Sequence, residues 1–306
     1  MKKAGRIILT TAGVALIVVL LRSCVATSYL IPSAGMENSL YQGERILVNK
    51  WSYGLRLPFM RLWGYHRWGD CDVGKEDILV FNNPANRLVD ISRREVFISR
   101  CIGLPGDTLL VDSFFTALPC EQYAPDQKFV YAYPKNKERQ LDTLLATLSI
   151  RHAERIGEDS LHYLRSFSRY EYYLLEQALY GHCWIQPAAR PDSLQKARAL
   201  IVPKKGRAVR VYPWNRVLLC NTLVLHEHRN AKIQNDTLYV DGRPVQHCVF
   251  TKDYYWVASN NAANVSDSRL FGFVPEDHLI GRASVIWFSR DKESGMRWDR
   301  IGKAVR

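Results

Sequence analysis

The feature that most constrains this chain is an apolar segment near its N-terminus. The fifteen residues from 7 to 21 carry no charge, and they lie between Lys2, Lys3 and Arg6 on one side and Arg22 on the other. At about 1.5 Å per helical residue, this segment would cover roughly 22 Å of a hydrocarbon layer that is about 30 Å thick. The segment alone is therefore short for a membrane span.

A longer helix over residues 4–26 would span the layer, because Arg6 and Arg22 can extend their charged ends to the two interfaces. A cleaved secretory signal, with its basic and short apolar regions, is one alternative. A lipoprotein signal ending at Cys24 is another, although Arg22 stands where such signals have a small or apolar residue. We expect residues 1–28 to be a cytoplasmic stub and an uncleaved anchor.

The charge distribution indicates where the body of the protein lies. Three basic residues precede the apolar segment and one follows it, which favours a cytoplasmic N-terminus and a body on the exported side of the cell (inner) membrane. The net charge of +12 suits either an anionic membrane surface or nucleic acid. No zinc-finger spacing, RNP-like strand or long basic helix accompanies it, so we expect membrane lipid and not nucleic acid as a partner.

The cysteines give no indication of a metal site or a redox pair. The sequence has seven of them and no C-x-x-C spacing, so we expect neither a metal nor another cofactor. An exported location permits disulfides among the six in the body, and the sequence leaves their pairing open. The cysteines are Cys24, Cys71, Cys101, Cys120, Cys183, Cys220 and Cys248.

Short β-branched runs bounded by Gly, Asn and Pro predict a mostly β body. A hairpin is predicted at 235–250, because Asp241-Gly242 is a tight-turn signal between two such runs. The segment 51–68 is rich in Trp, Tyr and Leu, which fits either core or an apolar surface at the lipid interface. The other predicted strands are 45–49, 77–82, 96–102, 108–111, 208–212, 216–219, 251–259 and 282–289.

Between residues 119 and 202 the apolar pattern changes to helical spacing, and we expect an inserted helical subdomain there. The expected β body is therefore made of residues 29–118 and 203–306. The helical pattern rests on Leu141, Leu144, Leu145 and Leu148, and on Leu161, Leu164, Phe167, Leu174 and Ala178.

Three segments of the sequence carry a resemblance. They are PSAGMENSL from Pro32, ISRCIGLPGDT from Ile98, and SNNAANVSDSRLFGFVPEDHLIGRA from Ser259. Together they resemble the signature segments of the signal peptidase I (leader peptidase) family, whose members are membrane-bound serine–lysine endopeptidases. The resemblance implies an antiparallel β body, one N-terminal transmembrane helix, and signal peptides of exported preproteins as partners.

The residues that carry out the family's chemistry are replaced in this chain. Family members have P-S-x-S-M-x-x-T-L, in which the serine before Met is the nucleophile; with Met36 as the anchor, that position is Gly35. They also have K-R-x-x-G-x-P-G-D, whose lysine is the general base; with Arg100 and Gly103 as anchors, that position is Ser99.

In the third segment, the serine that orients the lysine in the family aligns with Val265. The resemblance implies that Ser33 supplies an oxyanion-binding hydroxyl, together with the backbone N–H of Gly35. It also implies that Asp267 and Arg269 form a structural ion pair. A serine after proline often only caps a turn, which is the plain interpretation of Ser33.

Two functions remain open. The first is a catalytically inactive family member that holds signal-peptide-like segments, or an active paralogue, because a covalent route needs a nucleophile and a base that Gly35 and Ser99 lack. The second is an active endopeptidase with Ser33 as a relocated nucleophile and a histidine as base. No histidine adjoins Ser99 in the sequence, and we expect His278 to lie on a solvated turn.

Overall fold

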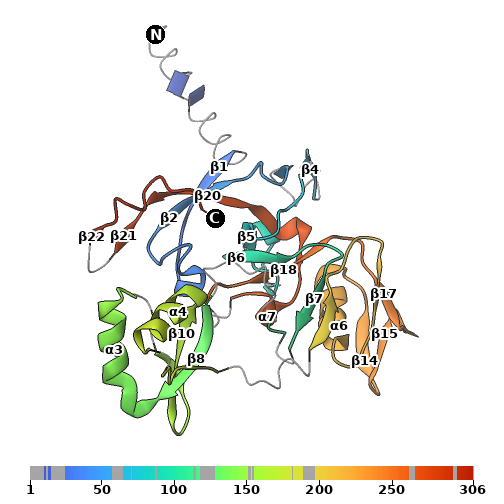
Figure 1. Cartoon of the computed structure of the whole chain (residues 1–306). Helices are drawn as coiled ribbons and strands as arrows, with labels where there is room; N and C mark the ends of the chain where they lie inside the picture. Colours follow the sequence, from blue (N-terminus) through green and yellow to red (C-terminus); the bar gives the residue numbers. More distant parts are fainter. Residues whose placement is uncertain are drawn as a thin grey trace. The chain divides into compact units, whose positions relative to one another are not determined.

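The structure is a computed structural model that describes most of the chain. The chain folds as two compact units, of which the first comprises residues 1–32, 43–98 and 277–306 and the second residues 33–42 and 99–276. Figure 1 shows the elements of both along the chain. The residues described are 10–11, 13–14, 25–56, 65–69, 71–86, 88–112, 115–117, 128–150, 153, 155–180, 182–188, 197–261, 266–291 and 295–305.

The first unit is built on antiparallel strands in the order β1-β2-β20-β5. Side chains of β2 alternate between the core and the surface: Ile46 and Val48 are buried, whereas Leu47 is exposed. The buried carboxylate of Glu44 accepts hydrogen bonds from Arg300 and from Ser289 Oγ. The strands are β1 Ala26–Leu30, β2 Arg45–Asn49, β3 Leu55–Arg56, β4 Arg67–Trp68, β5 Ile78–Asn82, β20 Leu279–Phe288, β21 Arg290–Asp291 and β22 Gly295–Met296.

The second unit contains the end of β6 and the short sheets that follow it. β18 pairs with β6 and with β19, and a separate core gathers Ile102, Trp256, Phe250 and Phe273. The strands outside the insertion are β6 Val96–Gly103, β7 Thr108–Val111, β12 Arg198–Ile201, β13 Ala208–Arg210, β14 Ala231–Gln234, β15 Thr237–Val240, β16 Arg243–Pro244, β17 His247–Val249, β18 Tyr254–Ala258 and β19 Val274–Pro275; the helices are α6 Arg216–His226 and α7 Ser268–Phe271.

Most of the predicted β body is confirmed, including the hairpin with its turn at Asp241-Gly242, where both residues have positive φ. The strand predicted over 216–219 is wrong, because these residues open helix α6. A short apolar run is compatible with either a strand or a buried helix. The eleven-residue length of α6 is what distinguishes this segment as a helix. Helix α6 buries Leu219 and Leu223, one turn apart, together with Cys220, Thr222 and His226.

The insertion is not purely helical, which corrects the expectation for residues 119–202. Its described part has a four-stranded sheet in the order β11-β8-β10-β9 together with two helices. Leu164 and Phe167, assigned above to a helical pattern with Leu161, lie on β10 and pair with Ala132 and Phe129 of β8. The elements are β8 Lys128–Pro134, α3 Glu138–Thr147, β9 Arg155–Glu158, β10 His162–Ser168, α4 Arg169–Ala178 and β11 Gln186–Pro187.

The helical part of the prediction holds where the spacing is strictest. On α3, Leu141 and Leu145 are one turn apart and both are buried. Helix α4 begins with a capping box, in which Ser168 Oγ accepts from Glu171 N at 3.1 Å and Glu171 Oε2 accepts from Ser168 N at 2.7 Å. The β10 residues were misassigned because pairing with β8 outweighs their local preference.

The expected membrane anchor lies mostly outside the described residues. Of the segment 7–21, only residues 10, 11, 13 and 14 are described, and these are helical. Within the part of the chain that the structure describes, no helix has the length and apolarity that a membrane crossing requires.

Candidate functional site

The candidate site is built around the turn that holds Gly35. This residue is buried in a 3-10 turn, η1 Ala34–Met36, and its carbonyl accepts a hydrogen bond of 3.0 Å from Asn261 N. Glu37 N closes the turn by donating to Ala34 O at 3.2 Å. The first signature segment is thereby bonded to the third, although 226 residues separate positions 35 and 261.

Arg100 and Asn260 join the second signature segment to the same turn. The buried guanidinium of Arg100 donates from Nε to Asn260 Oδ1 at 3.2 Å and from Nη2 to Ser39 Oγ at 2.7 Å. Asn260 Nδ2 donates to Glu37 O at 3.1 Å and to Ser39 Oγ at 3.0 Å. The asparagine thus satisfies polar groups of two segments.

Ser99 is fully buried on β6, and its hydroxyl donates to the carbonyl oxygen of Ser266 at 3.1 Å. The hydroxyl at position 99 therefore serves as a hydrogen-bond donor within the protein. This hydrogen bond joins Ser99 to the third of the three segments. Val265, which directly precedes Ser266, lies outside the described residues.

Asp267 and Arg269 form the ion pair that the resemblance implies. Arg269 Nη2 lies 2.7 Å from Asp267 Oδ2, and the aspartate side chain has no exposed surface. Asp267 Oδ2 also accepts from Ser259 N at 2.9 Å. Because this carboxylate has both a charged and a backbone donor, it connects Ser259, which follows β18, to the start of α7.

A buried lysine that sequence reasoning missed reaches the same turn. Lys128 Nζ lies 3.1 Å from Glu37 Oε2, and the lysine side chain has no exposed surface. Asn261 Nδ2 donates to the same carboxylate oxygen at 3.4 Å, and Lys128 N donates to Asn260 O at 2.6 Å. An amine is thus present beside Gly35, but it comes from β8 of the insertion and not from position 99.

Two local signals could have found this pair. The sequence from Lys128 to Pro134, KFVYAYP, alternates as a strand does, although we had assigned the region to helices. Glu37 is an acidic residue next to Met36 in a turn that is otherwise apolar or neutral. Neither signal says that the two side chains meet, since 91 residues separate them.

Ser33 occupies the N-cap position of the turn in an extended conformation, but its side chain makes no capping hydrogen bond. It is half-buried, and its hydroxyl is not used to hold the turn. The plain interpretation of this residue as a cap is therefore wrong.

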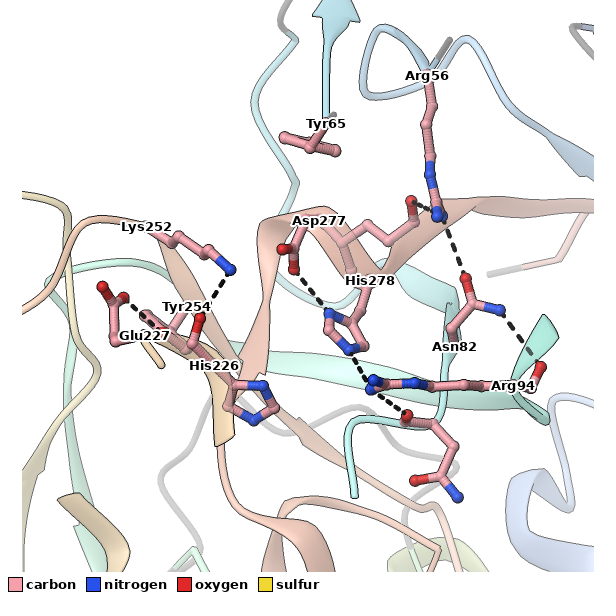
Figure 2. Close-up of polar contacts among 12 residues, drawn as sticks. Arg56, Tyr65, Asn82, Arg94, His226, Glu227, Lys252, Tyr254, Asp277 and His278 are labelled. Carbon is pink, nitrogen blue, oxygen red and sulfur yellow. Dashed lines mark hydrogen bonds and ion pairs between the residues drawn. The ribbon is translucent and has the colours of Figure 1, made fainter. Parts of the chain in front are cut away.

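The ring of His278 is held by neighbouring side chains of the first unit. His278 is buried, with 2% of its surface exposed, which corrects the expectation of a solvated turn. Both its ring nitrogens are engaged: Nδ1 lies 2.7 Å from Asp277 Oδ1, and Nε2 lies 2.9 Å from Arg94 Nη1 (Figure 2). Burial lowers the pKa of Arg94, while Asp277 raises it.

A second buried histidine, His226, makes structural contacts at the end of α6. His226 ends α6, and its carbonyl accepts from Lys252 Nζ at 2.8 Å (Figure 2). Its ring packs against Tyr254, whose hydroxyl donates to Glu227 Oε1 at 2.7 Å. These contacts close the end of the helix.

A small pocket adjoins the site in the second unit. It has a volume of about 40 Å³, and its wall combines apolar side chains with the buried Lys128 and with Arg269. The described residues include no group of His, Cys, Asp and Glu that could hold a metal ion. The lining residues are Ile102, Phe115, Thr116, Ala117, Lys128, Phe129, Trp256, Val257, Ala258, Ser259 and Arg269.

Comparison with known proteins gives consistent matches. The sequence model of the family described as signal peptidase, peptidase S26, matches residues 4–161 and 224–288. Signal peptidase I of Buchnera aphidicola subsp. Schizaphis graminum is 29% identical over 303 residues, covering 94% of this chain and 77% of that protein. Signal peptidase I of Aquifex aeolicus is 26% identical over 274 residues, covering 90% and 80%. Signal peptidase I of Pseudomonas aeruginosa is 39% identical over 93 residues, 30% of each chain.

Proposed function

Because this chain belongs to the signal peptidase family, peptidase S26, we propose that it is a membrane-anchored protein that holds signal-peptide-like segments without serine–lysine proteolysis. The observation that carries this proposal is Gly35, which has no side chain, lies in a buried turn and aligns in sequence with the family's nucleophile. Covalent hydrolysis of an amide needs a hydroxyl or thiol there, and a base that accepts its proton.

The nearby polar groups do not replace the missing pair. The Ser99 hydroxyl donates to a backbone carbonyl, and a serine is no base near neutral pH. Lys128 Nζ donates to the Glu37 carboxylate, whereas a general base must present a free lone pair. The arrangement around Gly35 therefore favours binding over bond cleavage.

Oxyanion binding is the part of the family's chemistry that these residues still support. The Ser33 hydroxyl makes no capping bond, so it is available, with the Gly35 N–H, to a peptide carbonyl. By the protease precedent, oxyanion binding without a nucleophile or base gives roughly 10³- to 10⁴-fold over water, several orders short of a working enzyme. We infer that an extended peptide is bound here through its backbone and small side chains.

Exposed apolar side chains of the first unit support attachment to a membrane. On neighbouring strands, Leu30, Leu47 and Trp287 lie around Ser28, which pairs with Leu47 and accepts from Trp287 Nε1 at 2.8 Å. Tryptophan and leucine of this kind are favoured at the lipid interface. Strand β1 follows soon after the apolar segment 7–21, so we propose a single span with a cytoplasmic N-terminus and an exported body.

The test of this function is a paired assay on the full chain in detergent micelles. A labelled preprotein with an intact signal peptide is incubated with the protein, and both cleavage and binding are measured. We expect binding in the micromolar range and no cleavage. Cleavage by the wild type, or the absence of any binding, would refute the proposal.

A second function rests on the free hydroxyl of Ser33. If Ser33 has become the nucleophile, the chain is an active endopeptidase that cleaves signal peptides from exported preproteins. Cleavage would then survive Gly35→Ala and disappear with Ser33→Ala. An active paralogue as partner is a further variant of the binding function, and capture of that paralogue by the full chain would identify it.

A further inference from the structure

A buried histidine of the first unit has its charge state fixed by its two neighbours. His278 Nδ1 lies 2.7 Å from Asp277 Oδ1, and its Nε2 lies 2.9 Å from Arg94 Nη1 (Figure 2). A guanidinium has donors and no acceptor, so Nε2 must accept this hydrogen bond and carries no proton. His278 is therefore the neutral tautomer with its proton on Nδ1, which donates to Asp277.

Arg94 uses the same guanidinium to hold the segment that leads into β6. Its Nη1 also donates to Asn83 O at 3.4 Å, and its Nε donates to Val89 O at 3.0 Å. Between Val89 and Arg94 the chain forms a 3-10 turn, η2 Ile91–Arg93, in which none of the three residues is buried. Apolar packing therefore contributes little to holding this turn, and the polar contacts of Arg94, including the one to His278, fasten it.

Charged and titratable groups face this contact from several elements of the first unit. They are Arg94, Asp90, Asp277, Arg56, Arg67 and Tyr65. Burial lowers the pKa of Arg94, while the carboxylates of Asp277 and Asp90 act in the opposite direction. Among histidine, aspartate, arginine and tyrosine, only histidine ordinarily changes its charge between pH 5 and 8. The ring of His278 is therefore the group of this cluster that responds to mild acid.

We propose that His278 and Arg94 form an acid-sensitive latch, in which protonation of the His278 ring expels the Arg94 guanidinium and frees residues 89–94. The proton, taken from solvent, occupies Nε2, the nitrogen that accepts from Arg94, while Nδ1 keeps its bond to Asp277. Two cations then stand where a hydrogen bond had been, so the guanidinium leaves, and its bonds to Asn83 O and Val89 O are lost with it. The latch is independent of peptide binding, and on the exported side of the membrane it would respond to the pH outside the cytoplasm.

Hydrogen exchange of the full chain in detergent micelles tests the latch, read by mass spectrometry of peptides that contain residues 89–95. The reporters are the amides of Arg93 and Arg94, which donate to Asp90 O and Ile91 O within the turn. After correction for the intrinsic exchange rate at each pH, their protection should be constant above about pH 7. Below about pH 6.5 it should fall by up to about 10-fold per pH unit, because the open state binds one more proton. The amides of β2, in the same unit, should keep their protection throughout.

Two variants separate the parts of the latch. His278→Gln should keep the turn protected down to pH 5, because its side-chain carbonyl accepts from Arg94 and takes up no proton in this range. Arg94→Met should give low protection at every pH, since it has no donor for the turn. His66→Gln, at an exposed histidine of the same unit, is the matched control and should behave as the wild type does. Coinciding profiles for wild type and His278→Gln, or a loss of protection in β2 together with the turn, would overturn the latch and leave the peptide-binding function untouched.

Discussion

Lys128 Nζ lies 3.1 Å from Glu37 Oε2, with both side chains buried beside the turn of Gly35. This contact brings an amine from the insertion to the first signature segment. The amine donates to a carboxylate, so the pair has the form of a structural ion pair. The same contact joins β8 to the first signature segment.

The first prediction concerns the stability that this pair provides. Lys128→Met should lower the free energy of unfolding by about 3–5 kcal/mol, because it leaves the Glu37 carboxylate buried without its charged partner. Combining Lys128→Met with Glu37→Leu should recover most of the loss, since an apolar pair of similar volume is often nearly neutral. Urea unfolding of the full chain in detergent measures both effects.

An exposed ion pair supplies the control. Arg229 Nη2 lies 2.6 Å from Asp241 Oδ2, but both side chains are about half exposed. Arg229→Met should therefore cost less than about 1 kcal/mol. A loss for Lys128→Met no larger than that for Arg229→Met would show that the buried contact does not stabilise the protein.

The second prediction concerns Asn260, which bonds three groups of two signature segments. Asn260→Leu removes the acceptor of Arg100 Nε and the donor to Glu37 O and Ser39 Oγ. The loss of these three buried hydrogen bonds should cost about 3 kcal/mol. The same substitution at Asn221, an exposed residue of α6, is the matched control and should change the unfolding free energy by less than about 0.5 kcal/mol. Equal effects at the two positions would contradict the network.

The signature turns can be located from the sequence, because each is contiguous and its geometry depends on local residues. In the segment after β6, Asp107 N donates to Leu104 O at 3.0 Å, and Gly106 has a φ of +92°, as the Pro-Gly turn predicts. Strands with clear alternation, such as Arg45–Asn49, were likewise predictable.

The remaining features depend on contacts between distant parts of the chain. No local pattern shows that Lys128 reaches Glu37, because the pairing arises only when β8 runs beside Asn260 and Asn261. His278 was expected in solvent because acidic residues precede it, yet Asp277 and Arg94 bond its ring in a buried setting. Polar neighbours in a sequence do not distinguish a solvated turn from a buried network.

The third prediction concerns pH. Burial, with a smaller contribution from Cys220, raises the pKa of Cys248 to about 11. In the unfolded chain a thiol ionises near pH 8.5, so between about pH 9 and 11 only the unfolded state loses this proton. The free energy of unfolding should therefore fall as the pH rises through this window, by at most about 1.4 kcal/mol per pH unit.

Cys248→Ala should make the alkaline slope shallower, even though the smaller side chain lowers stability at every pH. Cys71→Ala, at an exposed cysteine, should leave the slope unchanged. The measurement is urea unfolding at a series of pH values from 7 to 11. Identical slopes for wild type and Cys248→Ala would show that this thiol does not contribute to the pH dependence.

The last prediction concerns restored chemistry. Gly35→Ser, Ser99→Lys and Val265→Ser together should produce cleavage of a preprotein, and more than the sum of the single variants, because a nucleophile, its base and the group that orients the base act as a unit. Ser99→Lys places an amine where a buried hydroxyl now meets Ser266 O, so this change alone should destabilise the fold. The readout is cleavage by the full chain in micelles, with unfolding measured in parallel. A folded triple variant that binds the preprotein and leaves it intact would show that residues 35 and 99 do not stand in the family's catalytic register.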